Sequence, residues 1–152
     1  MGLRRVSVIG FCLAAVAAVV MLAAVIIRPP KIYISEICPS NSETSKKTAM
    51  QDKNGEPSDW IEIYNPTNRD ISLTGFSLSK NGGGDQPLGG YVIKAHDYII
   101  VYCSSAGFEN ADFPHADFSI GKVSEAEIIL KYDSFRCESI KMPKLNKGVS
   151  YS

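Results

Sequence analysis

The sequence predicts one all-β sandwich, residues 32–152, preceded by one N-terminal transmembrane helix. Residues 6–27 contain no charged side chain, which is typical of a membrane span. After residue 31 no segment has helical periodicity of useful length. That part instead divides into about seven or more short alternating segments, separated by turn residues roughly every 8–12 positions, which is typical of a β-sandwich.

The uncharged run is long enough to cross a bilayer as a helix. At about 1.5 Å per residue, residues 6–27 span about 33 Å, against a hydrocarbon core of about 30 Å. A cleaved signal peptide is the alternative, but the run is longer than a typical signal core and ends in Val-Ile-Ile at 25–27, which is a poor cleavage site. Lipidation at Cys12 is disfavoured because Phe11 precedes it. The sequence therefore favours an uncleaved signal anchor.

Charge next to the anchor predicts its orientation. Arg4 and Arg5 lie in the stub of residues 1–5 and favour the cytoplasmic side. Residues 28–31 form a short linker, in which Pro29 and Pro30 end the helix. We therefore expect a single-pass protein of the cell membrane whose C-terminal domain is extracytoplasmic.

The charge balance argues against a nucleic-acid partner. Lys and Arg total 16, as do Asp and Glu, and residues 1–30 hold three arginines and no acid. The remaining domain is therefore mildly acidic, at about minus three, whereas nucleic-acid binding needs a clustered basic surface. The tail lysines 141, 144 and 147 fit a solvated chain end better than a binding patch.

The expected strands follow from period-2 alternation of apolar residues. They are 31–37, 59–64, 71–78, 91–93, 98–103, 117–120, 126–132 and 136–142. A change of phase at Gly75 predicts a bulge there. The last two strands form a hairpin that turns at 133–135, and residues 39–57 and 104–116 are long polar loops.

Six segments occur in an order typical of a known family. They are ISEI at 34–37, SDWIEIYNPT at 58–67, DISLTGFSLS at 70–79, YIIVYCS at 98–104, HADFSI at 115–120 and GVSY at 148–151. With them, residues 34–152 resemble a lamin-tail domain (LTD), which is an immunoglobulin-like sandwich. The chain departs from the family at Phe76, where Trp is common, at Asp133-Ser134, where Asp-Gly is common, and at Ser152, where a final Gly-Arg is absent.

The resemblance implies a bacterial, membrane-anchored member of this family. It implies a non-enzymatic binding or tethering module at the cell surface, with no cofactor and no catalytic residue. The expected partners are the membrane, crossed once, and an unidentified cell-envelope component or protein. We expect its binding surface in loops 39–57 and 104–116, because sandwiches present ligands at their ends.

Two further functions stay open. In the first alternative, the chain is an accessory domain separated from a larger surface hydrolase or kinase-like protein. In the second, it is a small catalyst that uses His96 or His115. No Ser nucleophile motif is present to support catalysis. Both histidines lie beside acids, but neighbouring strand residues point to opposite faces, so turn and loop positions explain them better.

One loop has the composition of a weak calcium site. Asp52, Asn54, Glu56 and Asp59 offer oxygen ligands around Gly55, although the spacing is not that of an EF-hand. A polar turn on Asn-Gly explains the same residues without metal. We therefore assign no metal site.

The remaining candidates are cysteines and one aromatic residue. Cys38, Cys103 and Cys137 follow the anchor, where disulfides form, and a Cys103–Cys137 pair is conceivable. Free, apolar core cysteines are the favoured interpretation. Trp60 is a candidate ligand-stacking platform, but we expect the only tryptophan of a small sandwich in its core.

Overall fold

The computed structural model describes residues 29–41, 50–52, 55–104, 113–121, 126–133, 135–146 and 148–152. By its internal contacts the chain divides into two units, Met1–Pro30 and Lys31–Ser152. The predicted transmembrane segment, 6–27, lies outside the described residues. Within those ranges, no helix is long and apolar enough to cross a bilayer.

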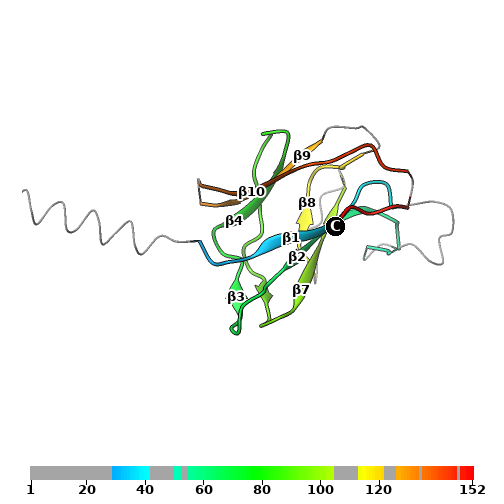
Figure 1. Cartoon of the computed structure of the whole chain (residues 1–152). Coiled ribbons are helices and arrows are strands. Elements are labelled where there is room, and N and C mark those ends of the chain that lie inside the picture. Colours follow the sequence, from blue (N-terminus) through cyan, green and yellow to red (C-terminus); the bar gives the residue numbers. More distant parts are fainter. Residues whose placement is uncertain are drawn as a thin grey trace, which may run out of the picture. The chain divides into compact units, whose positions relative to one another are not determined.

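In the described part of the second unit the chain forms ten strands, most of which are labelled in Figure 1. One four-stranded sheet has the order β1 (Tyr33–Cys38), β2 (Asp59–Tyr64), β7 (Tyr98–Cys103), β8 (His115–Ala116). The other has the order β10 (Phe135–Lys141), β9 (Glu127–Tyr132), β4 (Phe76–Lys80), β5 (Gln86–Pro87). A two-stranded sheet pairs β3 (Ile71–Ser72) with β6 (Val92–Ile93). All pairs are antiparallel except β7 with β8.

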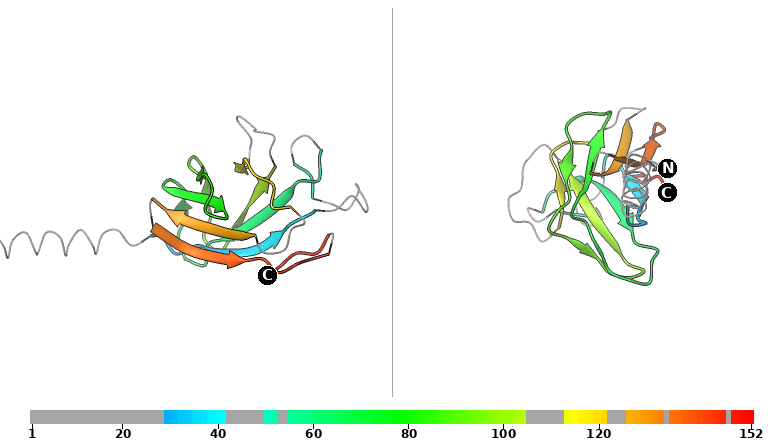
Figure 2. Two further views of the ribbon diagram at one scale, coloured as in Figure 1. Left: turned by 90° about the horizontal axis from the view of Figure 1, so that it is seen from above. Right: turned by 90° about the vertical axis from the view of Figure 1, so that its left-hand side faces the viewer.

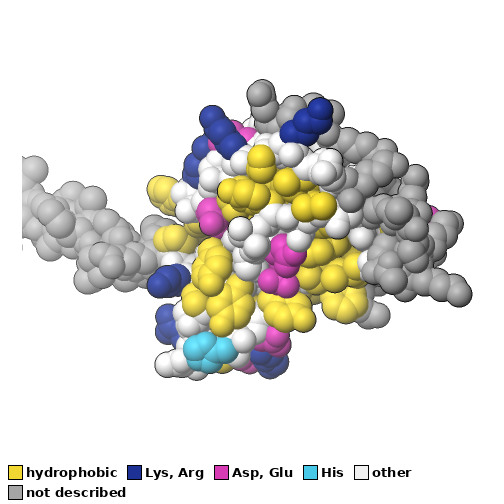
Figure 3. Space-filling model, turned by 45° about the vertical axis from the view of Figure 1, so that its right-hand side comes forward, with side chains coloured by type: hydrophobic (Ala, Val, Ile, Leu, Met, Phe, Trp, Pro, Cys, Tyr) yellow, Lys and Arg dark blue, Asp and Glu magenta, His cyan; other side chains and the backbone are white. Residues whose placement is uncertain are grey.

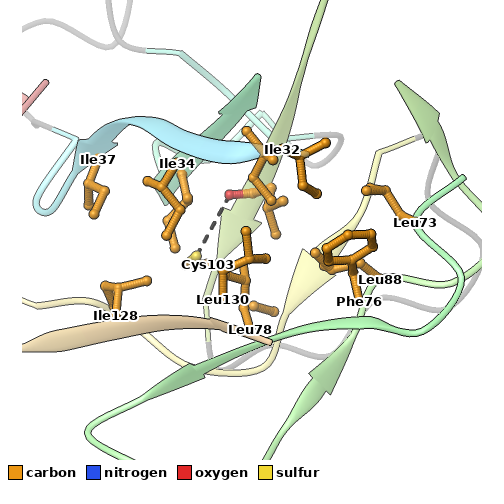
Figure 4. Close-up of a cluster of buried hydrophobic side chains, with 14 of the residues drawn as sticks. Ile32, Ile34, Ile37, Leu73, Phe76, Leu78, Leu88, Cys103, Ile128 and Leu130 are labelled. Atoms are coloured by element: carbon orange, nitrogen blue, oxygen red, sulfur yellow. Dashed lines mark hydrogen bonds between the residues drawn. The ribbon is translucent and has the colours of Figure 1, made fainter. Parts of the chain in front are cut away.

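Both four-stranded sheets contribute to one buried core. In β2, Ile61 and Ile63 are fully buried, and the same alternation buries Phe76 and Leu78 of β4. Figure 4 shows side chains of β1 facing those of β4 and β9 across this space. Burying each such side chain is favourable by about 1.5–3 kcal/mol, so this core is the main stabilising feature. The predicted all-β sandwich is confirmed, and the described residues are consistent with an immunoglobulin-like architecture.

The two sheets meet along the edge strands β1 and β10. Figures 1 and 2 show these strands side by side. The carboxylate of Glu138 on β10 accepts a hydrogen bond from the backbone N–H of Ile34 on β1 at 2.7 Å. Further along β1, Ile37 exchanges backbone hydrogen bonds of 2.9 and 2.8 Å with Tyr151. The outer edge of β1 is therefore occupied by the chain itself.

The segment 71–78 is not one bulged strand, as predicted. It forms β3 and β4 in different sheets, joined by a tight turn in which the N–H of Phe76 donates to the carbonyl of Leu73 at 2.9 Å. Gly75 occupies this turn with φ of +87°, and a Cβ there would lie 3.0 Å from Oδ1 of Asp133. The phase change in the sequence therefore marks a crossing between sheets rather than a bulge.

Another predicted strand is displaced. Residues 117–120 form no strand, and the chain pairs with β7 earlier, at His115–Ala116. The side chain of Ile120 is buried even so, which explains why an apolar pattern was visible there. The predicted hairpin of the last two strands is confirmed as β9 and β10.

Candidate functional site

The two long loops predicted to bind a partner both contact Tyr102 of β7. The Tyr102 hydroxyl donates a hydrogen bond to the carbonyl of Gln51 at 2.9 Å. Its ring meets that of Phe113 edge-on, with centroids 6.2 Å apart. Its backbone N–H donates to the carbonyl of Pro114 at 3.1 Å. One described part of each predicted loop, Gln51 from 39–57 and Phe113-Pro114 from 104–116, therefore lies beside Tyr102 at one end of the sheet. We call these residues and Tyr102 the loop end.

Asp59, at the start of β2, ties this end together. Its Oδ1 accepts a hydrogen bond from the N–H of Ser40 at 2.6 Å. Its Oδ2 accepts from the hydroxyl of Ser119 and from the N–H of Gly121, each at 2.9 Å. One carboxylate thus joins three segments that are distant in the sequence. Both of its oxygens serve the fold, and neither is left free of a donor.

Asp52 organises its own turn in the same way. Its Oδ2 accepts from the Ser58 hydroxyl at 2.7 Å, and its Oδ1 from the N–H of Glu56 at 3.1 Å. Of the four calcium candidates, Asp52 and Asp59 therefore hold backbone and hydroxyl donors, Glu56 is exposed, and Asn54 lies outside the described residues. The described part of the chain contains no group of three or more His, Cys, Asp or Glu placed to hold a metal ion.

The two histidines lie apart and in different settings. His96 occupies an exposed turn with φ of +57° and shares a hydrogen bond of 2.5 Å with Oδ1 of Asn68. His115 on β8 shares one of 2.9 Å with the Ser104 hydroxyl. The structure does not bring the two histidines together. His96 lies in a turn, as expected, whereas His115 lies in the short strand β8 and not in a loop.

The three described cysteines are free, and they differ in environment. Cys103 is buried in the core, and Cys38 is buried on the outer side of the same sheet. Burial raises the pKa of Cys38 to about 11, and the charges of Asp59 and Glu36 add to this effect. Cys137 is exposed on the edge strand β10. The expectation that all three are apolar core residues is therefore wrong for Cys137.

Trp60 is buried, but not in the core between the sheets. It belongs to a smaller cluster with Cys38 and Ile100 on the outer side of β1, β2 and β7, and Tyr102 packs against this cluster. In a strand, Trp60 and the core residue Ile61 must point to opposite faces. The prediction that Trp60 is buried is confirmed, whereas its expected place in the main core is wrong.

The same outer side carries a row of tyrosines. Tyr64 of β2 lies directly opposite Tyr33 of β1 and Tyr98 of β7. The rings of Tyr33 and Tyr64 meet edge-on at 5.6 Å between centroids. Tyr33 and Tyr98 are 39% and 57% exposed, which leaves aromatic surface open to a partner.

Beside this row lie two glutamates. Glu36 of β1 is directly opposite Glu62 of β2, and Glu62 is opposite Ile100 of β7. In Figure 3, hydrophobic side chains gather on one side of the domain with acidic side chains between them, while Lys and Arg lie toward its margins. We call Tyr33, Glu36, Glu62, Tyr64 and Tyr98 the tyrosine–glutamate face. The alternation in DWIEIY at 59–64 puts Trp60, Glu62 and Tyr64 on one face of a strand, but the surface that they form with β1 and β7 depends on strand pairing.

The comparison with models of protein families agrees with this architecture, whereas the comparison with curated proteins found no match. The family model described as Lamin Tail Domain matches residues 28–135, from the linker to the first residue of β10. Because this match covers more than half of the sequence, the chain belongs to the lamin tail domain family.

Proposed function

We propose that the chain is a non-enzymatic binding module, held on the outer side of a bacterial membrane by residues 6–27, that binds a cell-envelope component through its loop end. The uncharged run at 6–27 and the arginines of the stub support the anchor and its orientation. Membership of a family of β-sandwich domains supports a binding role. No step of catalysis is needed for such a role.

One observation carries the choice of surface: Tyr102 contacts both long loops. A strand residue that hydrogen-bonds Gln51 and packs on Phe113 brings one residue of each loop to the same place. Binding sites are commonly formed by loops that a rigid scaffold positions. The ring of Phe113 is 52% exposed although it is large and apolar, so it offers contact area to a partner.

Protease treatment of intact cells tests the anchor. We expect a C-terminal tag after Ser152 to be lost from intact cells, and a tag before residue 1 to be lost only after lysis. Protection of the C-terminal tag in intact cells would refute the proposed orientation.

Co-sedimentation of the full-length chain with isolated cell envelopes tests the surface. We expect Phe113→Ser combined with Tyr102→Phe to reduce the bound fraction at least threefold. Val92→Ser on β6 is the matched control, because Val92 is 50% exposed and belongs to the separate two-stranded sheet of β3 and β6. Equal binding of the loop-end variant and the control would exclude the loop end.

A further inference from the structure

The tyrosine–glutamate face has three aromatic rings in one row. It lies on the same side of the sheet as Tyr102 but at the other end of β2 and β7, and it shares no residue with the loop end. Tyr33, Tyr64 and Tyr98 come from three adjacent strands in register, so their rings span about 10 Å across the sheet. Large exposed aromatic side chains gathered on one face mark interaction sites in soluble domains. A row of this kind offers ring faces that attract cations.

The two glutamates make the same face negative at its centre. Like charges directly opposite each other on neighbouring strands are destabilising, yet Glu36 and Glu62 occupy such a pair. Glu62 accepts a hydrogen bond from the Ser35 hydroxyl at 2.6 Å, which orients its carboxylate without neutralising it. Among the described residues, the ion pairs are Lys94–Asp70, Lys131–Asp85 and Arg136–Glu127, and none involves either glutamate.

A partner must bind to the side chains of this face and not to the backbone at the edge of the sheet. The outer edge of β1 is closed by the Glu138 carboxylate at Ile34 and by the backbone of Tyr151 at Ile37. Addition of a strand from another chain would have to displace these contacts. The open surface is instead the row of rings and the adjacent carboxylates.

We propose that the tyrosine–glutamate face binds a polypeptide segment that carries several Lys or Arg side chains. The cationic groups pair with Glu36 and Glu62 and lie over the rings of Tyr33 and Tyr98. Each ion pair or cation–π contact at an exposed site is weak, so several must act together. A chain with several cations satisfies this condition, whereas a single small cation does not.

The test uses the full-length chain in non-ionic detergent and two synthetic probes. The first is a nine-residue peptide of alternating Arg and Gly, which presents its cations on one side when extended. The second replaces each Arg with citrulline, which has the same shape without the charge. We expect saturable binding of the arginine peptide at low salt, weakened at least tenfold at 1 M salt, and at least tenfold weaker binding of the citrulline peptide.

Paired variants locate the site. Glu36→Gln with Glu62→Gln keeps the side-chain shapes and should weaken binding of the arginine peptide at least tenfold. Asp85→Asn with Asp117→Asn changes the net charge equally, at exposed positions that do not belong to β1, β2 or β7, and should alter binding less than twofold. Trp60 fluorescence confirms that each variant is folded. Equal affinities of the two double variants would overturn the proposal.

Substitutions of Tyr98 distinguish binding of a cationic peptide from binding of a sugar. Tyr98→Phe keeps the ring and should retain the affinity for the arginine peptide, whereas Tyr98→Leu should lower it about threefold. Tight binding of chitohexaose that Tyr98→Phe abolishes, without binding of the arginine peptide, would identify a sugar-binding surface and overturn the proposal. Equal arginine-peptide affinities of the two double variants, with envelope binding retained by both, would leave the loop-end function standing while this inference fails.

Discussion

The carboxylate of Glu138 accepts a hydrogen bond from the backbone N–H of Ile34 at 2.7 Å and so joins the edges of the two sheets. The register of β10 against β9 shifts by a bulge between Arg136 and Glu138, directly beside this contact. An edge strand normally leaves backbone donors open to other chains. Here a side chain from the opposite sheet takes one of them.

Removing this hydrogen bond should lower the stability of the domain. Glu138→Ala should lower the free energy of unfolding by about 1–2 kcal/mol, because the Ile34 N–H loses its acceptor. Urea unfolding followed by Trp60 fluorescence measures the change. Glu138→Gln keeps an acceptor oxygen and should cost less; a larger loss for Gln than for Ala would contradict the assignment.

Removing the Asp59 carboxylate should have a larger effect. Asp59→Ala leaves the donors of Ser40, Ser119 and Gly121 without their acceptor, and we expect a loss of about 2–3 kcal/mol in the free energy of unfolding. Asp59→Asn retains one acceptor oxygen and should fall between the wild type and Asp59→Ala. A stability of Asp59→Ala equal to that of the wild type would show that these hydrogen bonds are dispensable.

Introducing a negative charge at Asn65 should lower the stability of the domain strongly. The buried amide nitrogen of Asn65 donates to the carbonyls of Arg69, Ile93 and Lys94 at 2.8, 3.1 and 2.9 Å. Asn65→Asp places a carboxylate oxygen against these carbonyls and should cost about 3 kcal/mol or more. The exposed change Asn146→Asp is the control and should stay within about 0.5 kcal/mol of the wild type. Similar melting temperatures for the two variants would refute the role of Asn65.

The cysteines should differ in reactivity. At pH 8 a thiol with a pKa of about 11, such as Cys38, is ionised in about one molecule per thousand, and its burial blocks access further. We expect iodoacetamide to modify Cys137 in the native domain, and Cys38 and Cys103 only after unfolding. Peptide mass spectrometry in a Cys12→Ser background reads each site. Comparable native labelling of Cys103 and Cys137 would contradict the structure.

The same pKa shifts predict a loss of stability at alkaline pH. Burial raises the pKa of Cys38 and Cys103 above the unfolded value of 9.0, so both stay protonated in the fold while the unfolded thiols ionise. The stabilising contribution is complete below pH 9 and decreases as the pH rises toward 11. Cys38→Ala with Cys103→Ala should flatten this decrease in urea unfolding curves measured between pH 8 and 11. An unchanged slope would show that other groups cause it.

Much of the domain could be predicted because strand signals are local. The alternation in DWIEIY identifies β2, and it correctly separates Trp60, Glu62 and Tyr64 from Ile61 and Ile63. The hairpin of β9 and β10 also follows from neighbouring segments. The pattern predicted the wrong strand in two places: at Gly75, where a change of phase marks a change of sheet, and at Ile120, which is buried without strand pairing.

The sequence by itself determined the class of fold, the faces of the main strands and the family, because period-2 burial and short motifs are written in consecutive residues. Only the tertiary structure decided that Glu36 lies opposite Glu62, that Tyr33, Tyr64 and Tyr98 form one row, and that Tyr102 contacts two loops. These relationships join residues that are far apart in the chain. They depend on strand register, which is set by pairing and by bulges such as the one between Ile34 and Glu36, and not by any local pattern.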